Sequence, residues 1–193
     1  MNENNETAIK LRELWGKANP LWETRYEDFI TTYTDYSVGT SKYLDSRGKV
    51  FGAGYEIYIV AFFLGLYADR RKPMTKDTSK KRKFGQPVGL WGQIEARGLR
   101  QPYPRIQDYI FAALYAKTDV DLIAVDKGEI QPAQVVSQMK QTMEEYANFG
   151  FSFMTEKLEE SPDYFFKEGA FLKLFLPFLQ NEEVVEDGPE PLD

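Results

Sequence analysis

The segment "AGYEIYIVAFFLGLYADRR", Ala53 to Arg71, decides the fold, because it contains the longest unbroken apolar run of the sequence, Ile57 to Leu64. Its apolar residues recur at helical spacing and widen into a broad face: Tyr55, Tyr58, Ile59, Val60, Ala61, Phe62, Phe63 and Leu66. A helix that is apolar on so many sides is usually central to a domain. The run is far shorter than the roughly 18 residues that a membrane-spanning helix needs. Pro73 is expected to stop this helix.

Further helices are predicted on both sides of this segment, from apolar residues at three- and four-residue spacing. They are expected over residues 7–17, 22–36, 104–117, 120–125 and 132–148, with helical patterns resuming after Gly150 and after Ser161. No stretch shows convincing strand alternation. The sequence therefore predicts an all-α fold, a single compact domain of about six to eight helices over residues 1–180.

Two segments stand apart from the predicted helices. Residues 73–104 are basic, rich in glycine and proline and without periodicity, which predicts a long loop that is either functional or mobile. Residues 181–193 hold six acids and no cation, which predicts a disordered acidic tail. The polar N-terminus has no signal-peptide pattern, so a cytoplasmic protein without a membrane partner is expected.

The sequence has no cysteine and no histidine. Their absence excludes disulfides, thiolate or imidazole metal sites, cysteine nucleophiles and Ser-His-Asp machinery. It also removes the side chain that normally titrates near neutral pH. No phosphate-loop motif is present. These observations favour a binding protein over an enzyme and predict no cofactor and no metal. A hydrolase that uses carboxylates and a hard cation is the remaining enzymatic alternative.

The charge is unevenly distributed. The net charge is −6, yet the segment from Asp69 to Arg105 carries eleven Lys or Arg against three Asp or Glu. A local basic surface can bind phosphate even within an acidic protein. The candidate contact residues are this segment's cations and two aromatic residues beside them: Arg70, Arg71, Lys72, Lys80, Lys81, Arg82, Lys83, Phe84, Trp91, Arg97, Arg100 and Arg105.

Three interpretations of this basic segment are open. Its cations could grip nucleic-acid phosphates while Phe84 and Trp91 anchor the loop or stack on a base. It could instead bind an acidic protein partner. In the third interpretation it is a solvated loop whose aromatic residues fold back onto the core, and Arg70, Arg71 and Lys72 complement the dipole of the preceding helix.

Two stretches resemble a known family. "KVFGAGYEIYIVAFFLGLYADRRKPM" (49–74) and "MEEYANFGFSFMTEKLEESPDYFF" (143–166) are similar to sequences in small accessory proteins encoded beside bacterial DNA phosphorothioation systems. The two stretches lie in the family's order, and the first 48 residues and "KKRKFGQPVGLWG" fall outside the match. The resemblance implies a prokaryotic defence system that modifies or restricts DNA, and it brings no catalytic residue.

Together these observations predict a non-enzymatic accessory protein that contacts DNA, or a complex bound to DNA, through a basic loop. The alternative is a protein–protein adapter whose basic loop binds an acidic partner without touching DNA.

Overall fold

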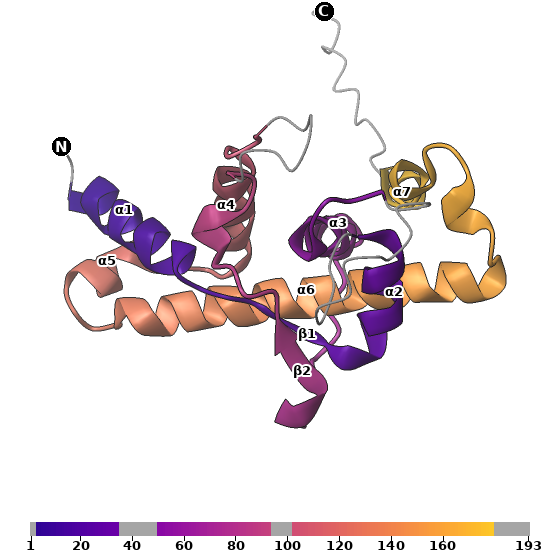
Figure 1. The fold of residues 1–193 in the computed structure, drawn as a ribbon. Helices are drawn as coiled ribbons and strands as arrows, with labels where there is room; N and C mark the ends of the chain where they lie inside the picture. The colour runs from indigo at the N-terminus through magenta and orange to yellow at the C-terminus, as the bar shows by residue number, and fades with distance from the viewer. Residues whose placement is uncertain (1–2, 35–49, 94–101, 180–193) are drawn as a thin grey trace, which may run out of the picture.

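A computed structural model describes residues 3–34, 50–93 and 102–179 of the chain (Figure 1). This part is mostly helical, which confirms the predicted fold class. Its α-helices are α1 (Glu3–Gly16), α2 (Glu27–Tyr33), α3 (Gly54–Tyr67), α4 (Ile106–Lys117), α5 (Leu122–Asp126), α6 (Pro132–Glu160), α7 (Ala170–Lys173) and α8 (Leu176–Leu179). Short 3-10 turns are η1 (Thr24–Tyr26), η2 (Thr78–Lys80), η3 (Val88–Leu90) and η4 (Tyr164–Phe166). The predicted acidic tail, 181–193, lies outside the described residues.

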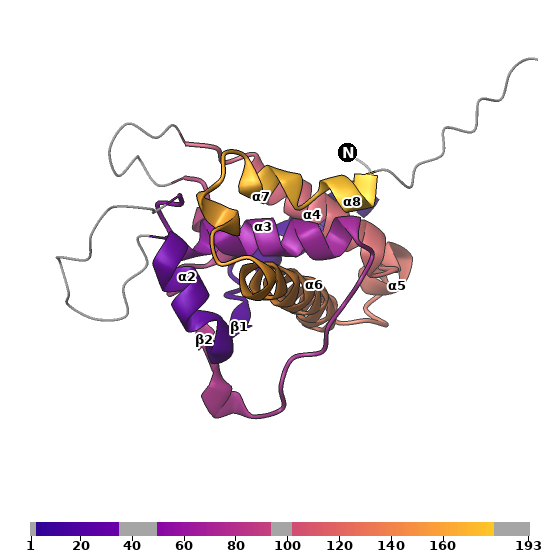
Figure 2. The same cartoon turned by 90° about the vertical axis from the view of Figure 1, so that its right-hand side faces the viewer.

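Helices α3 and α6 form the centre of the fold. Figure 1 looks along α3 and Figure 2 looks along α6, so the two helices cross at a steep angle. Helix α3 buries most of its surface, including Ile57, Tyr58 and Phe62, none of which is exposed to solvent. The prediction of a central helix in this segment is confirmed. It ends earlier than predicted, at Tyr67, because the chain turns at Asp69, whose φ of 47° is left-handed.

Glycines bring the two central helices into backbone contact. A Cβ on Gly150 of α6 would overlap the backbone of Ala61, and a Cβ on Gly65 of α3 would overlap the backbone of Tyr146. Only glycine permits such an approach. Gly150 therefore does not interrupt the helix as its sequence position suggested. Helix α6 runs without a break from Pro132 to Glu160, and the predicted end near residue 148 is wrong.

Residues 144–150 of α6, which read EEYANFG, pack against other segments of the chain, and several of them have structural roles. Glu144 accepts a hydrogen bond from the Leu21 amide at 2.8 Å, and the carbonyl of Glu145 accepts one from the Lys72 amide at 3.0 Å. Ala147 is buried. The carbonyl of Asn148 accepts a hydrogen bond from the Tyr26 hydroxyl at 3.2 Å. One of the two stretches that carry the family resemblance is therefore a packing motif.

A small two-stranded antiparallel ribbon accompanies the helices. Strand β1 (Leu21–Glu23) pairs with β2 (Lys81–Lys83), with Leu21 opposite Lys83, Trp22 opposite Arg82 and Glu23 opposite Lys81. A single helix over residues 22–36 had been predicted. The chain instead forms β1, the turn η1 and the shorter helix α2. The apolar residues that recur here at helical spacing are nevertheless buried: Tyr26, Phe29, Ile30 and Tyr33.

The turn after α3 is tied to α4 by an ion pair that depends on pH. Lys117 Nζ lies 2.7 Å from Asp69 Oδ1, and the Tyr146 hydroxyl donates to the same oxygen at 3.3 Å. The hydrogen bond and charge of Lys117 hold the pKa of Asp69 below its usual value. The same hydrogen bond raises the pKa of Lys117. Both groups are therefore charged in the folded protein near neutral pH.

We expect acid to remove the stability that Asp69 contributes. Because its folded pKa is lowered, the contribution is present above the unfolded value of about 3.9 and is lost as pH falls through the folded pKa. Asp69→Asn should reduce the free energy of unfolding at pH 7 by less than about 1 kcal/mol, since the pair is exposed. Urea denaturation should show that this difference vanishes near pH 2. A difference that is equal at both pH values would contradict the assignment.

Candidate functional site

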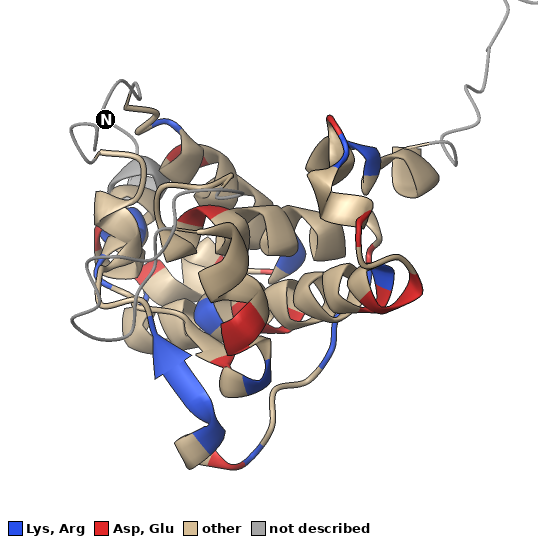
Figure 3. Cartoon of the chain, turned by 45° about the vertical axis from the view of Figure 1, so that its right-hand side comes forward, with Lys and Arg blue, Asp and Glu red and all other residues tan. Residues whose placement is uncertain are grey.

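The basic ribbon is the part of the described chain where cations project furthest from the helical body. It consists of β1, β2 and the turn before β2, and its cations are Lys76, Lys80, Lys81, Arg82 and Lys83. Figure 3 shows β2 extending away from the helices as a continuous basic strand. The interpretation of this segment as a loop is corrected, because residues 81–83 form a strand with a fixed register.

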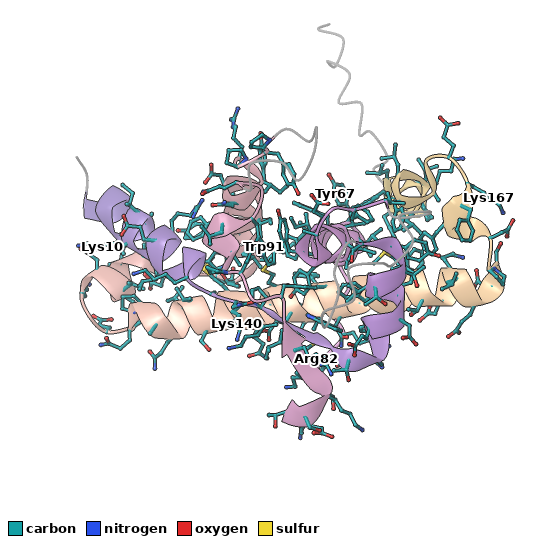
Figure 4. All side chains as sticks on the ribbon, viewed as in Figure 1. Lys10, Tyr67, Arg82, Trp91, Lys140 and Lys167 are labelled. Atoms are coloured by element: carbon teal, nitrogen blue, oxygen red, sulfur yellow. The ribbon has the colours of Figure 1, made fainter. Side chains whose placement is uncertain are left out.

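Aromatic stacking anchors the ribbon to the core. Phe84, directly after β2, stacks on Trp22 of β1 with ring centroids 5.5 Å apart, and it meets Tyr58 of α3 edge-on at 5.7 Å. Trp91 is fully buried and stacks on Tyr55 at 5.4 Å. Its indole N–H donates to the carbonyl of Gln86 at 3.2 Å. Figure 4 shows Trp91 pointing into the helical body.

These contacts decide between the two roles considered for the aromatic residues. A side chain with no exposed surface cannot stack on a nucleic-acid base, so Trp91 is an anchor and not a surface contact. Phe84 is half-buried between Trp22 and Tyr58 and also serves as an anchor. Both residues are removed from the set of direct nucleic-acid contacts.

A buried polar network holds the base of the ribbon. The carboxylate of Glu23, on β1, accepts hydrogen bonds from the Thr75 amide at 2.7 Å and from the Asn148 side-chain amide at 3.2 Å. Arg25 Nε lies 2.9 Å from the same carboxylate. The Asn148 amide also donates to the carbonyl of Pro73 at 3.0 Å. Because a buried carboxylate requires such partners, the network fixes the chain on both sides of the ribbon.

The side chains of the three cations at residues 70–72 pack against helix α6 and are not part of the ribbon. The guanidinium of Arg70 lies 6.0 Å from the Phe149 ring centroid, and that of Arg71 lies 5.5 Å from the Tyr146 ring centroid. Lys72 Nζ donates to the Ser152 hydroxyl at 2.7 Å. Three of the predicted contact residues thus make contacts with α6 that hold this segment against the helix.

Of the remaining predicted contacts, Arg105 is described by the structure, and it does not join the ribbon. Arg105 lies beside α4, with its guanidinium 6.0 Å from the ring centroid of Tyr109 on that helix. Arg97 and Arg100 lie outside the described residues. The site that the structure does bring together is therefore formed by Lys80, Lys81, Arg82 and Lys83, with the addition of Lys76.

Two of the five ribbon cations are paired within the protein. Arg82 Nη1 lies 3.0 Å from Glu27 Oε1, and Lys80 Nζ lies 3.8 Å from Asp77 Oδ2. Hydrogen bonds from the Ser79 hydroxyl and amide hold the pKa of Asp77 below its usual value. Within residues 3–34, 50–93 and 102–179, none of the other three ribbon cations, Lys76, Lys81 and Lys83, forms an ion pair.

An open cleft lies between the base of the ribbon and α6. Its volume is about 340 Å³. Lys76 and Lys81 line it from the ribbon side, and Lys140 lines it from α6. The other lining residues are Pro73, Met74, Thr75, Ser137, Gln141, Glu144 and Glu145. The cleft thus gathers cations from segments that are far apart in sequence.

Lys140, Ser137 and Gln141 were missed by reasoning from the sequence. They are polar positions of a predicted helix, in which Lys140 and Gln141 follow Ser137 by three and four residues. That spacing places them on one face of α6, together with Glu144. The pattern could have indicated a polar stripe, but nothing in it showed that the basic segment would lie beside that stripe.

Across the described ranges, Asp and Glu side chains do not gather in a group of three or more that could hold a metal ion. In those ranges, too, no helix combines the length and the apolar character that crossing a membrane requires.

Comparison of the chain with protein-family models, with curated proteins and with solved structures gives no match. The site must therefore be interpreted from its own chemistry.

Proposed function

We propose that this chain is a non-enzymatic, cytoplasmic accessory protein of a prokaryotic DNA modification–restriction system, and that it contacts DNA phosphates through the basic ribbon. One observation carries the proposal. Lys81 and Lys83 of β2, and Lys76 in the segment before it, form no ion pair with any described residue, on a ribbon that projects from an otherwise acidic protein. Lys76 and Lys83 are exposed and Lys81 is half-buried, and lysines without an ion pair that are held on a rigid support favour binding to a polyanion.

The support for DNA comes from the combination of this surface with the family resemblance. The two matching stretches include the crossing of α3 with α6 and the residues that anchor the ribbon, such as Asn148. The resemblance therefore covers the two central helices and their contacts with the ribbon, and it does not cover the cations of the ribbon itself. The cations of the ribbon lie on a short strand and the segment before it, so contacts to the phosphate backbone, independent of base sequence, are the mode that the ribbon favours.

The proposal is tested by the affinity for short DNA duplexes. The ribbon variant carries Lys76→Gln, Lys81→Gln and Lys83→Gln. The control variant carries Lys127→Gln, Lys157→Gln and Lys173→Gln, which change the net charge equally at sites on or beside α5, α6 and α7. At about 50 mM salt, where phosphate contacts are strong, the ribbon variant should bind at least tenfold more weakly than the control variant. Fluorescence anisotropy with two duplexes of unrelated sequence should give similar affinities for the parent protein.

The adapter function remains the second candidate, and one contact favours it. Arg82 already pairs with a carboxylate, Glu27, at 3.0 Å, so the ribbon accepts acidic side chains as well as phosphates. This function predicts that the parent has no affinity for DNA even at low salt. It also predicts that the ribbon variant, and not the control variant, loses an acidic protein partner. Equal DNA affinity of both variants would argue against the DNA-binding proposal.

A further inference from the structure

The cleft beside the ribbon has the composition of an anion site. Its three lysines come from the ribbon and from α6: Lys76 from the segment before β2, Lys81 from β2 and Lys140 from α6. Lys140, labelled in Figure 4, lines the cleft from α6, opposite the ribbon. The Ser137 hydroxyl and the Gln141 amide can supply further hydrogen-bond donors.

The two carboxylates in the lining have partners of their own. Glu144 is buried and accepts the Leu21 amide at 2.8 Å, and Lys140 Nζ lies 3.4 Å from its Oε1. Glu145 accepts the Gln141 amide at 2.8 Å and lies 4.0 Å from Arg71 Nη1. Neither carboxylate pairs with a lysine of the ribbon. Lys76 and Lys81 therefore remain available for an anion from outside the protein.

The position of the cleft indicates which anion it suits. Lysine ammonium groups bind phosphate as point charges and do not demand one fixed orientation. Side chains alternate along a strand, so Lys83 follows Lys81 on the same face of β2, about 7 Å further along. Arg82 points to the opposite face, where it meets Glu27. A chain of phosphates that enters the cleft can thus continue to Lys83.

We propose that the cleft lined by Lys76, Lys81 and Lys140 holds one phosphate group of the nucleic-acid chain that the ribbon contacts. This inference rests on the proposed function and extends the binding surface from the ribbon onto α6. It makes Lys140 a phosphate contact, although this residue lies outside the basic segment.

The test is the single substitution Lys140→Gln, with Lys127→Gln as a control that removes one exposed lysine elsewhere. Loss of one phosphate contact should flatten the slope of log affinity against log salt by about 1 unit for a duplex. Lys127→Gln should leave the slope unchanged. If the parent binds DNA and Lys140→Gln leaves the slope unchanged, the cleft assignment is overturned while the ribbon proposal stands.

A titration with inorganic phosphate separates the two proposals. The backbone amide resonances of Lys76 and Gln141 should shift in the parent and shift much less in Lys140→Gln. If the parent binds no duplex but shows these phosphate-dependent shifts, the cleft is supported as a phosphate site and the DNA-binding proposal fails. If neither the duplex nor phosphate binds, both proposals are overturned.

Discussion

Gly150→Ala is expected to lower the free energy of unfolding by about 4 kcal/mol or more, or to prevent folding altogether. The new Cβ would overlap the backbone of Ala61, which belongs to a helix and cannot move aside as a flexible side chain can. Helices α3 and α6 would have to separate along their whole contact. That separation would open space in the best-buried region of the protein, where Ile57, Tyr58 and Phe62 lie.

The matched control is the same substitution at Gly16, at the end of α1. A Cβ there would meet nothing closer than 3.6 Å, which is an ordinary contact. Gly16→Ala should therefore change the free energy of unfolding by less than about 0.5 kcal/mol. Urea denaturation of both variants measures the difference. A Gly150→Ala protein as stable as Gly16→Ala would show that the helices do not approach as closely as described.

Trp91→Ala is expected to cost about 3–5 kcal/mol of unfolding free energy, because it removes a fully buried indole and leaves a cavity. It also removes the stacking on Tyr55 and the edge-on contact with Tyr58. The neighbouring Leu90 is 48% exposed, and Leu90→Ala should cost less than about 0.5 kcal/mol. Thermal or urea denaturation would give both values.

This pair of variants also separates the two roles of the tryptophan. If Trp91 stacked on a nucleic-acid base, its removal would weaken DNA binding while leaving the stability of the protein near that of the parent. The structure requires the opposite order, in which stability falls first and any loss of binding follows from unfolding. A stable Trp91→Ala protein with weakened DNA binding would contradict the assignment of Trp91 to the core.

The fold was predictable from the sequence wherever apolar periodicity was strong. Helix α3 carries apolar residues on nearly all sides, which only a central position can bury. In α1, the apolar residues differ in burial: Leu11 and Trp15 are buried, while Ile9 and Leu14 are exposed. Periodicity thus located this helix but did not fix which of its apolar residues face the core.

The features that escaped prediction depend on contacts between distant segments. Strands of three residues, such as β1, are too short to show alternation, and β1 exists because β2 pairs with it. A glycine within a helical pattern suggests a break until the close approach of Ala61 to Gly150 is known. Trp91 stands among glycines and prolines, so its burial depends on Tyr55 and Tyr58.

The candidate site was predictable in part. The charge pattern located residues 80–83, which do lie on an exposed ribbon. It also placed Arg70, Arg71 and Lys72 in the candidate site, because a count of charges cannot show that these side chains pack against α6. Lys140 was missed for the converse reason, since it is an isolated cation in an acidic helix. Tertiary packing decides which cations share a surface.

The salt dependence of duplex binding tests most directly whether the ribbon is the DNA-contacting surface. The affinity is measured for the parent, the ribbon variant and the control variant over a range of salt concentrations. Loss of three phosphate contacts should flatten the slope of log affinity against log salt by about 3 units in the ribbon variant. The control variant should keep the slope of the parent. A ribbon variant with the parent's slope would contradict the account.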